Sequence, residues 1–128
     1  MSYIKIMRIL STKWFKKWLK KTKIKNQEVL KAVDNLENNL STADLGSGLY
    51  KIRVSSTNRG KSSAFRTIVV YKKEDRTVFV YGFAKNEKSN IDKSELQYFK
   101  KLGKDLLSLD PDQLQHAIEQ QILFNLEV

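Results

Sequence analysis

Hydrophobic positions in the first forty residues follow a strand pattern once and a helical pattern twice. Residues 3–10 are rich in Ile and predict a short strand, after which Ser11 or Thr12 can cap a helix. Apolar side chains then recur at helical spacing and form one stripe: Trp14, Phe15, Trp18 and Leu19. Asn26 can cap a second helix, whose apolar face recurs in the same way: Val29, Leu30, Val33, Leu36 and Leu40. We expect the two helices to form a helical hairpin.

The middle of the chain changes to a strand pattern. After a predicted loop over residues 41–48, residues 49–54 alternate between apolar and polar, which places Lys51 and Arg53 on one face of a strand. A polar, basic, glycine-containing loop over residues 55–63 follows.

Residues 64–72 and 77–85 predict a hairpin of two central strands, because both segments are apolar on both faces. If this hairpin is symmetric about Glu74–Asp75, Arg66 pairs with Phe83. On the same face as Arg66 the sequence then places three side chains: Tyr81, Phe83 and Lys85.

Helical spacing returns in the last third of the chain. Asp92 can cap a helix, with Glu95 placed to complete a capping box, and Asp110-Pro111 can start the last helix. The element order β-α-α-β-β-β-α-α predicts an α+β fold for a single domain spanning residues 1–128. We expect a small antiparallel sheet of about four strands, packed by the N-terminal helical hairpin and the C-terminal helices.

The composition limits the kinds of metal site and membrane segment that the chain can form. Cysteine is absent and His116 is the single histidine, so a thiolate site is excluded and a histidine zinc site is disfavoured. We therefore expect no metal and no cofactor. No run of about 18 apolar residues and no secretion signal is found, so we expect a cytoplasmic protein without a membrane span. The helix with Trp14 and Trp18 could lie on a membrane surface, but burial of its stripe against the sheet is the favoured interpretation.

The charge is strongly positive and unevenly placed. The net charge is +10, and residues 1–25 carry nine Lys or Arg without an acid. A second group of cations comes from three strands and one loop: Lys51, Arg53, Arg59, Lys61, Arg66 and Lys85. Cations at alternate positions of a strand are poor material for a core, so they favour a polyanionic partner such as a phosphate backbone. The alternatives are a solvated basic edge and, for Arg66, an ion pair with Glu87 or Glu95.

These residue types permit RNA cleavage without a metal. RNA supplies its own nucleophile, the 2′-hydroxyl, and needs a base, an acid and stabilisation of the phosphorane charge. No histidine lies near the cluster, so a lysine would act as base, and repulsion among neighbouring cations favours its neutral form. Arginine stabilises the phosphorane, while Tyr81 could stack on a base or donate a proton.

The order and spacing of five segments resemble one family: TKWFKKW, DLGSGLYKIRV, GKSSAFRTIVVYKK, FVYGFAKNEKSNI and ELQYFKKLGKDLLSL. Together they resemble the RelE-like toxins of bacterial toxin–antitoxin systems. The similarity is greatest to the RelE/HigB branch, whose members carry a G-K-x-x-x-x-R strand entry and an F-x-K-N-E motif. It runs from about Thr12 to Leu126.

The resemblance implies an mRNA endonuclease that acts on messages at the ribosome and inhibits translation. It implies catalysis by strand-borne cations without metal, at matching positions: Lys51, Arg53, Lys61, Arg66 and Lys85. We add four candidate RNA-binding residues: Arg59, Tyr81, Phe83 and Lys88. Some relatives place a stacking tyrosine near the C-terminus, where this chain offers only Tyr98 on a predicted helix.

The implied partners are mRNA, the ribosome and a cognate antitoxin encoded next to the toxin, expected to be a helix-turn-helix protein. Operator DNA would be reached only through that antitoxin. Two other functions stay open. A sister group with the same fold poisons DNA gyrase without being an enzyme, and a nucleic-acid-binding regulator would lack catalysis. The strand-borne cations favour the ribonuclease, and no recognition helix stands out to favour the regulator.

Overall fold

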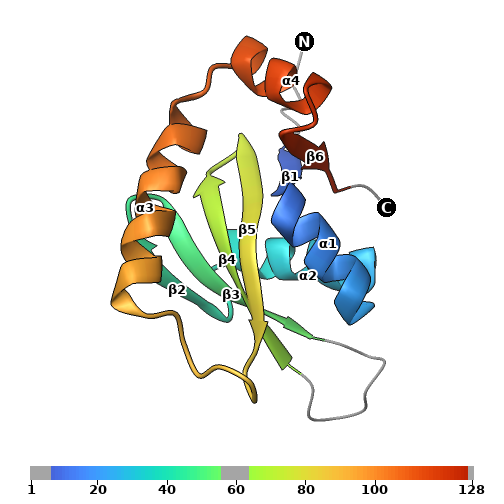
Figure 1. The fold of residues 1–128 in the computed structure, drawn as a ribbon, viewed down its shortest axis with the longest axis vertical. Coiled ribbons are helices and arrows are strands. Elements are labelled where there is room, and N and C mark those ends of the chain that lie inside the picture. Colours follow the sequence, from blue (N-terminus) through green and yellow to red (C-terminus); the bar gives the residue numbers. More distant parts are fainter. Residues whose placement is uncertain (1–6, 56–63, 127–128) are drawn as a thin grey trace.

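A six-stranded sheet with helices on both faces forms the protein (Figure 1). The computed structural model describes residues 7–55 and 64–126. Along the chain, the elements are β1 (Arg8–Thr12), α1 (Lys13–Thr22), α2 (Asn26–Glu37), β2 (Thr42–Gly46), β3 (Leu49–Ser55), β4 (Ala64–Lys72), β5 (Arg76–Ala84), α3 (Lys93–Ser108), α4 (Pro111–Glu119) and β6 (Leu123–Asn125). The predicted α+β class is confirmed.

The sheet has the strand order β2-β3-β4-β5-β1-β6. Strands β2 to β5 form an antiparallel meander, β1 adds parallel to β5, and β6 pairs antiparallel with β1. The prediction of about four strands was too low, because residues 42–46 form an edge strand where we expected a loop. The three residues of β6 are too few to give an alternating pattern.

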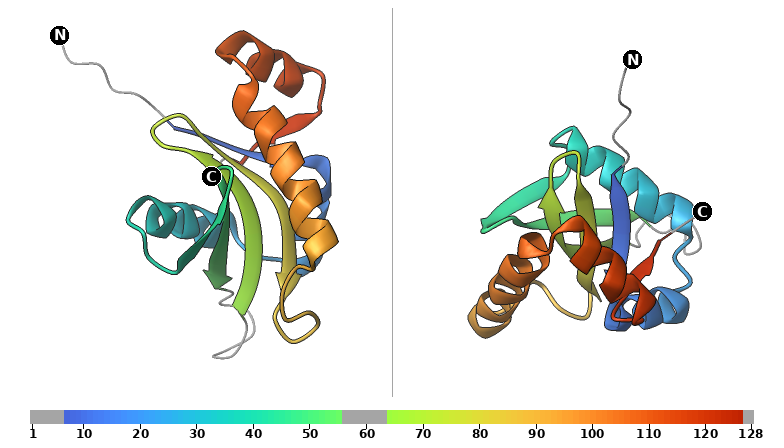
Figure 2. Two further views of the ribbon diagram at one scale, coloured as in Figure 1. Left: turned by 90° about the vertical axis from the view of Figure 1, so that its left-hand side faces the viewer. Right: turned by 90° about the horizontal axis from the view of Figure 1, so that it is seen from above.

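The hydrophobic core has two parts, one on each side of the sheet. Figure 2 shows the helices that lie on the two sides. Side chains of α1 and α2, such as Phe15 and Val33, pack against one face, on Ile52 and Phe79. Side chains of α3 and α4 pack on the other face, around Ile68. The central strands are therefore covered on both sides, which explains their continuous apolar sequences.

The ends of the helices agree with most of the predicted caps. The Thr12 side chain accepts a hydrogen bond from the backbone of Phe15, at 3.3 Å, and caps α1. Both predicted starts in the C-terminal third are confirmed, with capping boxes at Asp92 and Asp110. The prediction for Asn26 was wrong, because Lys25 is the N-cap of α2 and Asn26 is already helical.

Leu40 lies outside α2 and is exposed, although the helical spacing extends to it. The helix ends at Glu37, and Asn39 follows in the left-handed conformation (φ 57°), which asparagine tolerates better than most residues. The apolar stripe was therefore predicted one turn too long.

Arg76 begins β5 inside the core, where the sequence predicted a turn residue. Its side chain is only 2% exposed. The guanidinium donates to Asp75 at 2.7 Å through Nε and to the carbonyl of Leu106 at 2.8 Å through Nη1. The β4–β5 turn is thus tied to the C-terminal part of α3. Among the helices within residues 7–55 and 64–126, none has the length and apolar character needed to cross a bilayer.

Candidate functional site

Two cross-strand rows bring cations and aromatic rings to one face of the sheet. Arg53 on β3 lies opposite Arg66 on β4, and Arg66 lies opposite Phe83 on β5. In the next row, Lys51 faces Ile68, and Ile68 faces Tyr81. Directly opposed residues share a face, so the predicted pairing of Arg66 with Phe83 and its shared face with Tyr81 are confirmed.

An extra residue in β5 gives the aromatic side chains this orientation. From Lys72 to Val69, the hairpin pairs around a turn centred on Glu74, and the register then shifts by one residue. Val80 is the extra residue, because Phe79 pairs with Val69 and Tyr81 pairs with Ile68. Such a β-bulge redirects the side chains that follow it. Without the bulge, a glycine rather than Phe83 would lie opposite Arg66.

The arginine row lies at the end of the face that α3 leaves free. Phe99 of α3 packs on Tyr81, with ring centroids 5.1 Å apart, and Gly103 lies against Val70. Both contacts fall on the Tyr81 row or further along the sheet toward the β4–β5 turn. The row of Arg53 and Arg66 lies beyond them, with Arg53 exposed and Arg66 half-buried.

Arg66 has an unpaired nitrogen in the interior. Its Nη1 atom is buried and has no hydrogen-bond partner among the residues described, even though the side chain as a whole is only half-buried. The alternative of an ion pair with Glu95 is not observed, because Glu95 pairs with Lys88, and no ion pair joins Arg66 to Glu87 either. A buried donor without a partner is costly, and an anion at this position would remove that cost.

Of the other four cations in the predicted cluster, the structure describes two. Lys51 is half-buried, and its Nζ donates to Asn90 at 3.3 Å, which ties β3 to the segment after β5. Lys85 is exposed just beyond the end of β5. Arg59 and Lys61 lie outside the described residues.

Lys88 is held by two partners on the rim of this face. Its Nζ donates to both carboxylate oxygens of Glu95 at 2.5 Å and to the Tyr81 hydroxyl at 3.5 Å. The hydrogen bond with Glu95 raises the pKa of Lys88 above its usual range, so Lys88 stays charged and is a poor base. The same bond, with a second one from the backbone of Asp92, lowers the pKa of Glu95.

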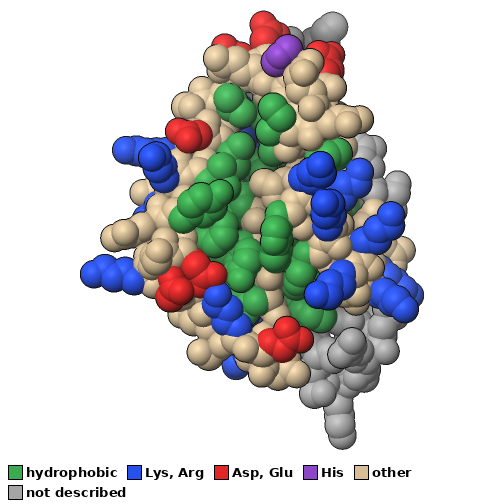
Figure 3. Space-filling view, in the orientation of Figure 1, with side chains coloured by type: hydrophobic (Ala, Val, Ile, Leu, Met, Phe, Trp, Pro, Cys, Tyr) green, Lys and Arg blue, Asp and Glu red, His purple; other side chains and the backbone are tan. Residues whose placement is uncertain are grey.

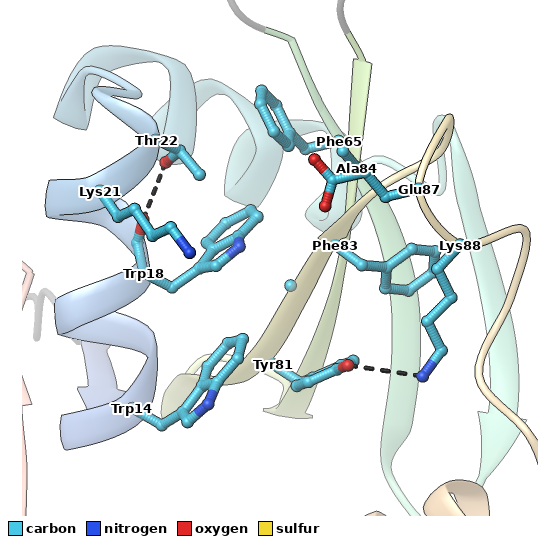
Figure 4. A pocket seen from close by; sticks show the side chains of 11 residues that line it. Trp14, Trp18, Lys21, Thr22, Phe65, Tyr81, Phe83, Ala84, Glu87 and Lys88 are labelled. Carbon is cyan, nitrogen blue, oxygen red and sulfur yellow. Dashed lines mark hydrogen bonds between the residues drawn. The ribbon is translucent and has the colours of Figure 1, made fainter.

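An aromatic pocket of about 410 Å³ adjoins the rows at the edge of β5 (Figure 4). Trp14 and Trp18 of α1 form one wall, and Tyr81 and Phe83 lie across from them. The Trp14 and Tyr81 ring centroids are 4.7 Å apart. A Cβ atom on Gly82 would lie 2.6 Å from the Trp18 ring, so only glycine lets Trp18 approach β5 this closely.

The sequence predicted the rows of cations but not this pocket. Phe15 and Leu19 are buried as expected of the stripe, whereas Trp18 is half-buried and Trp14 is 46% exposed. Tryptophans at helical spacing normally indicate core, so the periodic pattern hid the pocket. The contact between Glu95 and Lys88 was missed because Glu95 was considered only for the capping box and for an ion pair with Arg66.

The face as a whole offers cationic and hydrogen-bonding groups rather than a metal site. Within the described parts of the chain, no three His, Cys, Asp or Glu side chains are grouped as metal ligands. In the view of Figure 3, Lys and Arg side chains gather beside an apolar strip. This arrangement can hold phosphate oxygens at the arginines and flat rings beside them.

Comparison with known proteins agrees with this geometry. A family model described as the RelE toxin of the RelE / RelB toxin-antitoxin system matches residues 7–126. No curated protein matches the sequence. The family match spans nearly the whole chain and includes both cross-strand rows, so the protein belongs to the RelE toxin family of toxin–antitoxin systems.

Proposed function

We propose that this toxin is a metal-independent endoribonuclease that cleaves mRNA, with the ribosome presenting the message. The observation that carries the proposal is the buried, unpaired Nη1 of Arg66 in register with Arg53. Two arginines in directly opposed positions, one with an unsatisfied donor, suit an anion whose charge grows during the reaction. The phosphorane of RNA cleavage is such an anion.

The proposed reaction uses only groups of the RNA and of this chain. The 2′-oxygen attacks the adjacent phosphorus while a lysine of the site, Lys51, Lys61 or Lys85, accepts its proton. The phosphorane charge is stabilised by Arg53 and Arg66. The P–O5′ bond then breaks, and the departing 5′-oxygen takes up a proton, for which Tyr81 is the candidate donor. The products are a 2′,3′-cyclic phosphate and a 5′-hydroxyl.

The biological setting follows from membership of the family. The partners proposed are mRNA, the ribosome and an antitoxin, expected to be a helix-turn-helix protein encoded by the neighbouring gene, through which operator DNA is bound. Translation takes place in the cytoplasm, so we place the toxin there. Arg59, Phe83 and Lys88 are proposed to contact the RNA around the reacting phosphate.

Induction of the toxin without its antitoxin tests this function. We expect growth arrest with loss of translation before any loss of DNA supercoiling, and primer extension should show new 5′ ends inside coding regions. A Lys73→Ala toxin is the matched control, because Lys73 is an exposed cation in the turn at the opposite end of the β4–β5 hairpin. Intact messages together with gyrase-linked DNA breaks would instead identify a gyrase-directed toxin.

A further inference from the structure

The aromatic pocket forms because β5 extends beyond the end of its neighbour β1. β1 pairs with β5 only as far as Ser11 opposite Phe79, and the chain then turns into α1 at Lys13. The last residues of β5 therefore face a helix instead of a strand. The helix packs its two tryptophans against this edge, and the pocket opens beside these contacts, where Phe83 and Lys88 also line it (Figure 4).

Trp14 offers a flat ring to whatever enters the pocket. It is 46% exposed, although it stacks on Trp18 with centroids 6.3 Å apart and contacts Tyr81. Tyr81 in turn contacts Phe83, whose centroid lies 6.1 Å away. Rings held by their neighbours lose little conformational entropy when another ring stacks on them, and every nucleobase has a suitable face.

The charges around the pocket favour a nucleic acid over an apolar peptide as its ligand. Helix α1 carries five lysines and no acid: Lys13, Lys16, Lys17, Lys20 and Lys21, of which Lys16 and Lys20 line a different pocket. Lys21 and Lys88 line the aromatic pocket itself, together with one carboxylate, Glu87. The carboxylate disfavours a phosphate inside, whereas the lysines of α1 favour phosphates outside. An uncharged ring within and a phosphate backbone along the helix fit both observations.

The pocket also lies next to the cross-strand row of Arg53 and Arg66. Phe83 lies opposite Arg66 in the sheet, and it also lines the pocket. A strand of RNA with one phosphate at Arg66 therefore has a base or sugar next to this opening. A volume of about 410 Å³ accommodates a single base.

We propose that the pocket formed by Trp14, Trp18, Tyr81 and Phe83 binds one unpaired nucleobase of the RNA, with neighbouring phosphates on the lysines of α1. The inference rests on the proposed function for the identity of its ligand. It adds a base-binding subsite on α1 to the cationic rows of the sheet.

Tryptophan fluorescence reports on this pocket directly, because Trp14 and Trp18 are the only two tryptophans in the chain. The probe is a short single-stranded RNA with 2′-O-methyl groups, which cannot be cleaved, titrated into the full chain at low salt. We expect saturable quenching of the tryptophan emission. Binding measured by anisotropy without any change in tryptophan emission would overturn the proposal.

Substitution of Trp14 gives a second readout. Trp14→Ala should weaken binding of the probe by roughly 5- to 150-fold, the range for loss of one stacked base, while Trp14→Phe should retain part of the affinity. Tyr98→Ala is the matched control, because Tyr98 is a 65% exposed aromatic residue on α3 outside the pocket. Parent-like RNA affinity in a folded Trp14→Ala chain that no longer binds its antitoxin would assign the pocket to a protein partner and contradict the proposal.

The two proposals can fail separately. Quenching without any cleavage of an unmodified message would contradict the ribonuclease and leave the base-binding pocket intact. Cleavage that proceeds while the tryptophans remain unperturbed would contradict the pocket and leave the ribonuclease intact.

Discussion

Arg53 and Arg66 lie directly opposite each other on β3 and β4, two like charges in register on one face of the sheet. Like charges in directly opposed positions destabilise a sheet, and the buried Nη1 of Arg66 adds an unsatisfied donor. The fold tolerates this arrangement at the end of the face that α3 leaves uncovered. We interpret the pair as an anion site whose cost is offset when a phosphate binds.

Arg66→Ala should separate activity from stability. We expect cleavage to fall by about 10²–10³, the usual loss when one charge-stabilising donor is removed. The melting temperature should equal or exceed that of the parent, because the variant removes the repulsion with Arg53. Arg66→Lys should restore little activity, since an ammonium lacks the two-pronged geometry of the guanidinium. Kinetics and thermal melting of the three chains check this, and a joint loss of activity and stability in Arg66→Ala would support a structural role instead.

Binding to RNA should weaken steeply with salt. Each neutralised phosphate of a single strand contributes a slope of about −0.7 in the plot of log affinity against log salt concentration. Four to six contacts predict a slope of about −3 to −4, and Arg66→Ala should make it shallower by about 0.7. The Lys73→Ala chain should keep the parent slope. A slope near zero in the parent would exclude the cationic rows as the binding surface.

The sequence predicted the pairing of Arg66 with Phe83 correctly, but the prediction did not include the bulge in β5. The prediction assumed a hairpin symmetric about Glu74–Asp75, whereas the turn is centred on Glu74 and the extra residue Val80 corrects the pairing by one position. No sequence signal marks this bulge, because residues 78–80 are uniformly apolar. The alternation that places Lys51 and Arg53 together was sufficient, since it depends only on the strand period.

The pocket and the buried arginine could not be predicted from local patterns. Trp14 and Trp18 fit a helical stripe, and their partial exposure depends on where β1 ends relative to β5. Arg76 stands next to a turn in the sequence, and its burial depends on the carbonyl of Leu106, thirty residues away. Long-range contacts of this kind override a residue's usual preference for the surface.

The ion pair of Glu95 with Lys88 predicts how the stability of the fold depends on pH. Hydrogen bonds from Lys88 and from the Asp92 backbone lower the pKa of Glu95 from its usual 4.5. The stabilisation is therefore complete above that usual value and is lost as the pH falls through the lowered pKa. Glu95→Gln should be less stable than the parent at neutral pH, and the difference should shrink in acid. Urea denaturation midpoints at neutral and acidic pH check this, and a constant difference would contradict it.

Arg76→Met should destabilise the fold without altering the cationic rows. The substitution leaves the Asp75 carboxylate and the Leu106 carbonyl without their arginine partner, at a cost of about 2–3 kcal/mol. That loss corresponds to a melting temperature lower by roughly 10 °C. The control is Lys73→Ala, an exposed cation in the same turn, which should melt like the parent. An unchanged melting temperature in Arg76→Met would mean that the buried guanidinium does not hold α3 to the sheet.

The chemistry of the cut ends tests the central claim most directly. Purified toxin should be mixed with ribosomes carrying a defined message, with and without excess EDTA, and the fragments should be analysed by mass spectrometry. We predict a 2′,3′-cyclic phosphate on one fragment and a 5′-hydroxyl on the other, unaffected by EDTA and nearly absent with Arg66→Ala. An uncut message, a cut that requires a metal, or full cleavage by Arg66→Ala would contradict the account.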